Sequence, residues 1–126
     1  MRSRHVYTKL HAWTLPCERV AFLDYDMVPL RPLDGIFAQC PTGRLCGTQD
    51  VTTPKRPGVR VINAGVMLLR PNRTLFRSMV AAVADEVRRG VVRTLSEQGF
   101  LSQHFPRWRG LPSGWNVPPR GLKAWS

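Results

Sequence analysis

Apolar residues in the first quarter of the chain predict a helix followed by a short strand. In residues 6–15 the larger apolar side chains recur every three to four positions, which is typical of an amphipathic helix, and Pro16 would end it. Residues 20–23 form a continuous apolar run of four, as expected of a strand buried on both faces of a helix-covered parallel sheet.

Shorter elements are predicted further along. Residues 33–37 have room for one helical turn between breaker residues, and a short strand at residues 45–48 lies in a region rich in Pro, Gly and Thr. A second buried strand is expected at residues 65–69, where Gly is followed by Val, Met and two Leu.

The second half of the chain favours helices. Residues 75–89 carry an apolar face at helical spacing and a basic last turn, and Gly90 supplies a stop. Thr94 and Glu97 have capping-box spacing and are predicted to open another helix that runs to His104.

Strands that alternate with helices indicate an α/β layer structure, for which we expect a mixed, mostly parallel sheet with flanking helices. Only two or three strands can be counted, which suits part of a larger α/β domain. Residues 110–126 contain three prolines, three glycines and two tryptophans and are predicted as irregular coil packed by aromatic side chains.

Composition indicates one folded domain over residues 1–126, because 43% of the residues are hydrophobic and 21% are charged. No apolar run approaches the roughly 18 residues of a transmembrane helix, and the basic N-terminus is not followed by the apolar stretch of a signal peptide. The three cysteines, Cys17, Cys40 and Cys46, are odd in number and form no Cys-x-x-Cys pair. They are therefore interpreted as free thiols and small core residues in a reducing compartment, and the chain as cytoplasmic.

The charge balance is strongly basic, with 19 Lys and Arg against 8 Asp and Glu and a net charge of +11. Such a surplus points to a polyanionic partner such as nucleic acid. The basic residues are scattered along the chain and nearly all are Arg, so a solvated basic surface is the competing interpretation.

The candidate chemistry begins at Asp24-Tyr25-Asp26, directly after the first predicted strand. The two carboxylates are expected to point to the same face, because side chains alternate with period two along a strand, and the carboxyl end of a strand is where open α/β sheets bind ligands. Two converging carboxylates form half of a site for Mg²⁺ or Mn²⁺. A solvated turn is the alternative.

Two further motifs carry polar side chains beside predicted elements. Asn63-Ala64-Gly65 places an amide and a glycine where a polar ligand could approach the backbone, with an ordinary turn as the alternative. Glu97 and Gln98 place a carboxylate and an amide at a helix start, with a capping box and an exposed Gln as the alternative.

Taken in order, these motifs resemble the glycogenin-like glycosyltransferases, glycosyltransferase family eight. The resemblance extends from about Tyr7 to Asn116. It rests on Tyr7-Thr8-Lys9-Leu10-His11-Ala12-Trp13, Asp24-Tyr25-Asp26, Leu33-Asp34-Gly35-Ile36-Phe37, Asn63-Ala64-Gly65-Val66-Met67, Glu97-Gln98-Gly99-Phe100-Leu101, Leu111-Pro112 and Trp115-Asn116.

The resemblance implies a partial glycosyltransferase-A-type fold and a role for each matching residue. Asp24 and Asp26 would match the metal-binding Asp-x-Asp, with Asp24 near the ribose, and Lys9 matches a lysine near the donor. Gln98 would lie beside the reacting sugar, and Glu97 stands where the family usually has Asp, so its contact with the sugar changes in reach. The remaining donor-binding residues implied are Tyr25, Asn63, Ala64 and Gly65, with Asn63 on the sugar.

The implied reaction is retaining transfer of a hexose from a UDP-sugar, UDP-glucose or UDP-galactose, with Mn²⁺ or Mg²⁺ as cofactor and an unspecified acceptor. The family's N-terminal nucleotide-binding segment and its late segment with a metal-binding His and a phosphate-contacting Lys have no match here. A truncated, weakly active or inactive hexosyltransferase is therefore expected, with self-association through an exposed sheet edge. The alternative is a non-catalytic remnant or a basic RNA- or polyanion-binding protein.

Overall fold

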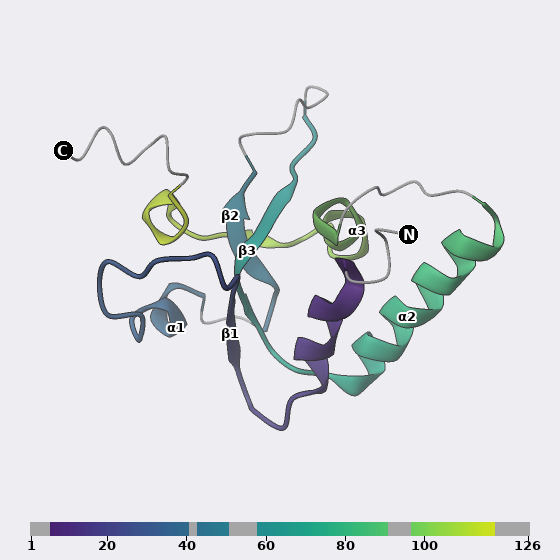
Figure 1. Ribbon diagram of the computed structural model, residues 1–126, viewed down its shortest axis with the longest axis horizontal. Coiled ribbons are helices and arrows are strands. Elements are labelled where there is room, and N and C mark those ends of the chain that lie inside the picture. Colours follow the sequence, from purple (N-terminus) through teal and green to yellow (C-terminus); the bar gives the residue numbers. More distant parts are fainter. Residues whose placement is uncertain (1–5, 41–42, 51–57, 91–96, 118–126) are drawn as a thin grey trace.

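The computed structural model describes residues 6–40, 43–50, 58–90 and 97–117 (Figure 1). Within them, helices and strands alternate irregularly around a four-stranded sheet, so the α/β class is confirmed. In chain order the elements are η1 (Val6–Thr14), β1 (Val20–Leu23), α1 (Ile36–Gln39), β2 (Cys46–Gln49), β3 (Ile62–Leu69), α2 (Arg73–Arg88), α3 (Glu97–His104), β4 (Arg109–Gly110) and η2 (Ser113–Trp115).

The sheet has the strand order β1-β3-β2-β4, and its pairing is mostly antiparallel. Both β1 and β2 run antiparallel to β3, and only the two-residue β4 pairs in parallel, with β2. The expectation of mostly parallel pairing is therefore wrong. Parallel neighbours need a crossover connection, usually a helix, but among the described elements β3 comes next after β2, and Asp50 N–H donates to Val61 C=O at 2.7 Å just beyond them.

Strand β3 crosses the middle of the molecule and is buried on both faces. Met67 and Leu69 enter one hydrophobic cluster, whereas Val66 and Leu68 enter another on the opposite face. The predicted buried strand is confirmed here and starts at Ile62, earlier than expected. By contrast, β1 is only half-buried along its length, because it lies at an edge of the described sheet.

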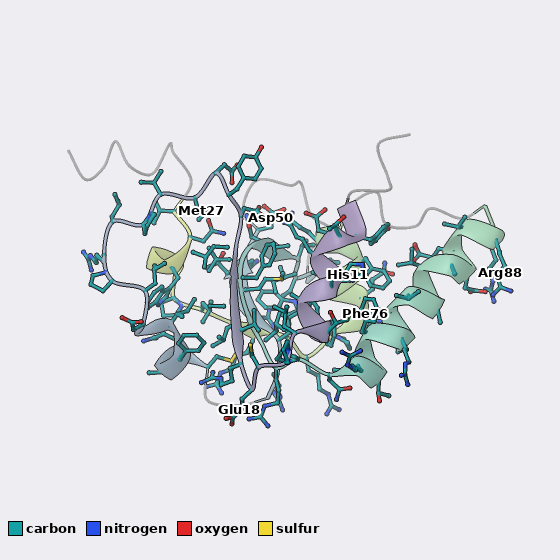
Figure 2. All side chains as sticks on the ribbon, turned by 60° about the horizontal axis from the view of Figure 1, so that its bottom comes forward. His11, Glu18, Met27, Asp50, Phe76 and Arg88 are labelled. Carbon is teal, nitrogen blue, oxygen red and sulfur yellow. A yellow bond between two sulfur atoms is a disulfide. The ribbon has the colours of Figure 1, made fainter. Side chains whose placement is uncertain are left out.

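Helices cover the two faces unequally (Figure 1). η1, α2 and α3 pack on one face around the larger cluster, and the short α1 packs on the other with η2. Figure 2 shows His11 of η1 facing Phe76 of α2, and their ring centroids are 5.1 Å apart. This packing holds η1 against α2, which matters because η1 carries Lys9.

The helices follow the predicted pattern with local differences. α2 begins after Asn72, whose Oδ1 accepts a hydrogen bond from Leu75 N–H at 3.0 Å, and it ends before Gly90, which has a positive φ of 64°. The first helix is confirmed as helical, but as a 3₁₀ helix. Thr94 and the end of the predicted coil lie outside the described residues, so the capping box is untested there.

Cys40 and Cys46 are joined by a disulfide, and their Cα atoms are 6.4 Å apart. The prediction that all three cysteines are free thiols is therefore wrong, although both residues are buried in the core as expected. Cys17 is free and exposed. The pairing is invisible in the sequence because β2 and the end of α1 meet only after the sheet has formed.

Among the described helices, none combines the length and hydrophobicity needed to span a bilayer.

Candidate functional site

The site is centred on the ammonium group of Lys9, which projects from η1. Its Nζ lies 2.8 Å from Oδ1 of Asp24 and 3.1 Å from Oε1 of Glu97, and it donates a hydrogen bond to the carbonyl of Ala64 at 3.2 Å. The Lys9 side chain is 18% exposed, so these charge-assisted contacts are largely shielded from water. Four chain segments far apart in sequence thus meet at one cation.

The electrostatics of Lys9 combine two opposing effects. Burial by itself lowers the pKa of the ammonium group, but hydrogen bonds and charges from Asp24 and Glu97 raise it, and the net pKa lies above the usual 10.5. Lys9 is therefore fully charged at neutral pH. One cation between two carboxylates leaves the site with a net negative charge.

Asp24 follows β1 but does not continue it. Its N–H donates to Gly65 C=O at 2.9 Å, and its own carbonyl accepts from Met27 N–H at 3.1 Å, which closes a turn over residues 24–27. The argument that Asp24 and Asp26 share a face because strand side chains alternate is therefore wrong, since the strand ends at Leu23. Tyr25 and Asp26 occupy the exposed middle of this turn.

Asn63-Ala64-Gly65 forms an irregularity in β3. Thr48 pairs with Asn63 and Gly47 with Met67, so residues 64–66 have no counterpart on β2. Side chains of the site satisfy the backbone groups released here: Oε1 of Gln98 accepts from Ala64 N–H at 3.0 Å, and Lys9 donates to Ala64 C=O.

Asn63 stabilises the same irregularity through its side chain. Its Oδ1 accepts from Gly65 N–H at 2.9 Å, the two-residue spacing of an Asx turn, and from Nδ2 of Asn116 at 2.9 Å. Both the turn and the ligand-site interpretation of this motif are thus compatible with the structure, because the turn presents Asn63 beside Gly65 and Asp24.

Gly65 permits the close approach of three side chains. A Cβ atom built at this position would lie 3.0 Å from Oδ1 of Asn63, 3.4 Å from Oδ2 of Asp24 and 3.5 Å from Nδ2 of Asn116. The absence of a side chain, and not an unusual backbone angle, is what this position requires.

The structure brings most of the sequence-predicted site residues into one contact network. The members of this network are Lys9, Asp24, Asn63, Ala64, Gly65, Glu97 and Gln98. Tyr25 and Asp26 lie in the adjoining exposed turn, and the roles expected of all these residues stay predictions. Asn116 had not been expected as a site residue, although it ends the last motif of the resemblance. In the described part of the chain, no group of three or more His, Cys, Asp or Glu side chains could hold a metal.

Known proteins match this chain over most of its length. No family model matches the chain. Over 114 residues, or 89% of this chain, it is 32% identical to glycogenin-1 of Caenorhabditis elegans. It is 26% identical over 111 residues to UDP-glucuronate:xylan alpha-glucuronosyltransferase 2 of Arabidopsis thaliana, and 25% identical over 135 residues to glycogenin of Cryptococcus neoformans.

The chain is homologous to the glycogenin-like glycosyltransferases. The resemblance seen in the motifs is thereby confirmed over most of this chain. The chain spans only 24% of the length of the C. elegans protein, 16% of the Arabidopsis protein and 14% of the Cryptococcus protein. The glycogenin-like motifs from Lys9 to Asn116 all fall within the described residues.

Proposed function

We propose that this chain carries the donor-site region of a hexosyltransferase that uses a UDP-sugar and retains the anomeric configuration. The observation that supports this most is the convergence of Lys9, Asp24, Asn63, Glu97 and Gln98 around the β3 irregularity. Its relatives named glycogenin support glycosyl transfer, and they match 89% and 94% of the chain.

A divalent cation fits the residues of the Asp24–Asp26 turn. Oδ1 of Asp24 contacts Lys9, whereas its Oδ2 faces Gly65, and Asp26 offers an exposed carboxylate in the same turn. Carboxylate oxygens suit Mn²⁺ or Mg²⁺, which keep several positions for water and substrate phosphates. When bound, such a cation would neutralise the diphosphate and stabilise UDP as the leaving group.

The other side chains bind and orient the donor in this proposal. Lys9 holds Asp24 and Glu97 in place and adds positive charge beside the donor. Asn63 uses its carbonyl oxygen within the protein, so its amide N–H groups are the ones directed to a sugar hydroxyl. Gln98 is held by Ala64 N–H, and Glu97 accepts hydrogen bonds from sugar hydroxyls.

We expect the 126-residue chain to bind UDP weakly and to transfer sugar slowly or not at all. The described residues offer two carboxylates but no third His, Cys, Asp or Glu side chain to complete a metal site. Water and diphosphate would have to fill the remaining positions, and positioning supplies much of the rate in such reactions.

The test is calorimetric titration of UDP with Mn²⁺ into the purified chain and into Asp26→Asn. Asp85→Asn is the matched control, because Asp85 pairs with Arg88 and Arg89 on the surface of α2. Metal-dependent binding that Asp26→Asn abolishes and Asp85→Asn preserves would support the donor site. Binding that ignores both Mn²⁺ and Asp26 would contradict it.

A further inference from the structure

A hollow of about 330 Å³ opens between the end of η1, the end of β3 and the segment after α3. Trp13, Leu69, Leu75 and Phe105 contribute apolar walls. This volume lies within the range of small-molecule sites, roughly 300–1,000 Å³.

This hollow lies away from the Lys9 site. Leu69 is five residues along β3 from Ala64, a separation of about 15 Å on a strand. Figure 2 shows Met27 and Glu18 at opposite ends of the sheet. Met27 closes the turn that begins at Asp24, and the Glu18 carboxylate is 4.0 Å from the guanidinium of Arg70, which lines the hollow.

A second, more polar hollow adjoins the first. It shares Arg44, Arg107 and Trp108 with it and adds Arg60 and Arg109. The Arg60 guanidinium stacks 4.1 Å from the centre of the Trp108 ring and donates a hydrogen bond to the Trp108 carbonyl at 3.4 Å. The Arg60 guanidinium is therefore held in a defined place.

Positive charge along the two hollows is unbalanced. Their arginines are Arg44, Arg60, Arg70, Arg107 and Arg109, and none of the described residues that line either hollow is acidic. The Glu18 carboxylate near Arg70 is 85% exposed, so its screening effect is weak. Five guanidinium groups with so little screening make the electrostatic potential of the two hollows positive, which favours binding of an anion.

We propose that these joined hollows bind a small organic phosphate with an apolar or aromatic body. The phosphate lies among the guanidinium groups, which match its oxygens in bidentate geometry, and the body fills the apolar hollow beside Trp13 and Phe105. This site is distinct from the proposed donor site and requires no metal.

The probe is 1-naphthyl phosphate, titrated calorimetrically in EDTA so that no metal supports binding at Asp24 and Asp26. Inorganic phosphate and 1-naphthol are the two half-ligands, and each should bind at least about tenfold more weakly than the whole probe. Equal affinity for either half-ligand would overturn the proposal.

The variant Arg44→Gln/Arg107→Gln removes two cations shared by both hollows. We expect its dissociation constant for 1-naphthyl phosphate to rise at least about tenfold, with an unchanged thermal midpoint because both side chains are exposed. The control Arg77→Gln, on the exposed face of α2, should leave binding intact. Equal affinities of the double variant and the control, or binding of a single-stranded oligonucleotide without binding of the probe, would overturn the proposal.

Discussion

Lys9 is the residue on which the site depends most. Its ammonium group separates two carboxylates, contacts the backbone of β3, and lies 5.4 Å from the centre of the Phe22 ring. Without it, Asp24 and Glu97 would face one another across a half-buried space as like charges.

We predict that Lys9→Met lowers the free energy of unfolding by about 1–3 kcal/mol, because two carboxylates lose their charge-assisted partner. Urea unfolding monitored by circular dichroism measures this change. Arg77→Met, which removes an exposed cation from α2, should cost much less. Equal losses in the two variants would show that the Lys9 contacts contribute little.

Gly65 gives a second prediction at this scale. Gly65→Ala should crowd Asn63 and Asp24, whose oxygens lie 3.0 and 3.4 Å from the new methyl position, and destabilise the fold by about 1–3 kcal/mol. Binding of UDP with Mn²⁺ should weaken as well. The matched control is Gly114→Ala, where no atom outside the adjoining backbone and neighbouring residues lies within 4 Å of the new methyl group. If the two variants melt and bind alike, Gly65 is not needed for close packing.

At the scale of single residues, the sequence selected side chains that the structure brings into contact, but one argument for selecting them was wrong. Asp24 and Asn63 were selected as ligand candidates from motifs, and the structure places them beside the same glycine. The supporting argument from strand alternation failed, because a turn replaces the strand after Leu23. The turn itself is local, closed by Met27 N–H donating to Asp24 C=O, whereas the contact of Asp24 N–H with Gly65 C=O joins distant segments.

At the scale of elements, the irregularity in β3 creates the site. A regular ladder would have paired Ala64 with β2 and left no backbone groups for Lys9 and Gln98. A further consequence is that α3 is tied to β3 by two side chains, Gln98 at Ala64 and Ser102, whose Oγ accepts from Ile62 N–H at 2.9 Å.

The end of α3 carries a pH-sensitive group, His104. Its ring stacks on Phe100, meets Phe105 edge-on and lies 3.5 Å from the Ser78 hydroxyl, so none of these contacts is charged. Burial lowers the pKa of His104 below its usual 6.5. The unfolded chain therefore takes up a proton at a higher pH than the folded protein does.

We predict that stability declines as the pH falls from about 6.5 to the lowered pKa of His104, and that His104→Gln removes part of this decline. Thermal midpoints measured between about pH 5 and pH 8 test it. Gln103→Ala, which changes an exposed uncharged side chain of the same helix, serves as the control and should keep the slope. An unchanged slope in His104→Gln would exclude His104 as its source.

At the scale of the whole molecule, the Cys40–Cys46 disulfide closes a short loop on the sheet face that carries the smaller hydrophobic cluster. We predict one reactive thiol, that of Cys17, in the denatured but unreduced protein, and three after reduction. Thiol titration with a chromogenic disulfide measures both values. Three thiols without reductant would show that Cys40 and Cys46 are not joined.

The sequence by itself determined the main secondary-structure elements and the choice of candidate site residues. Local patterns are sufficient for β1 and α2, because apolar runs and helical spacing depend on neighbours along the chain, and α2 differs from its prediction by only a residue or two at each end. Homology motifs selected Lys9, Asn63 and Gln98 for the same reason, since each motif is a short local segment.

Only the tertiary structure decided how these pieces are joined. The antiparallel pairing of β3, the irregularity at Ala64 and the ion pairs of Lys9 all link segments that are separate in sequence. Each of these contacts forms because burying the two faces of β3 brings its partners together. Hydrophobic patterning specifies that a face is buried, but the partner on that face is chosen by the packing of the whole chain.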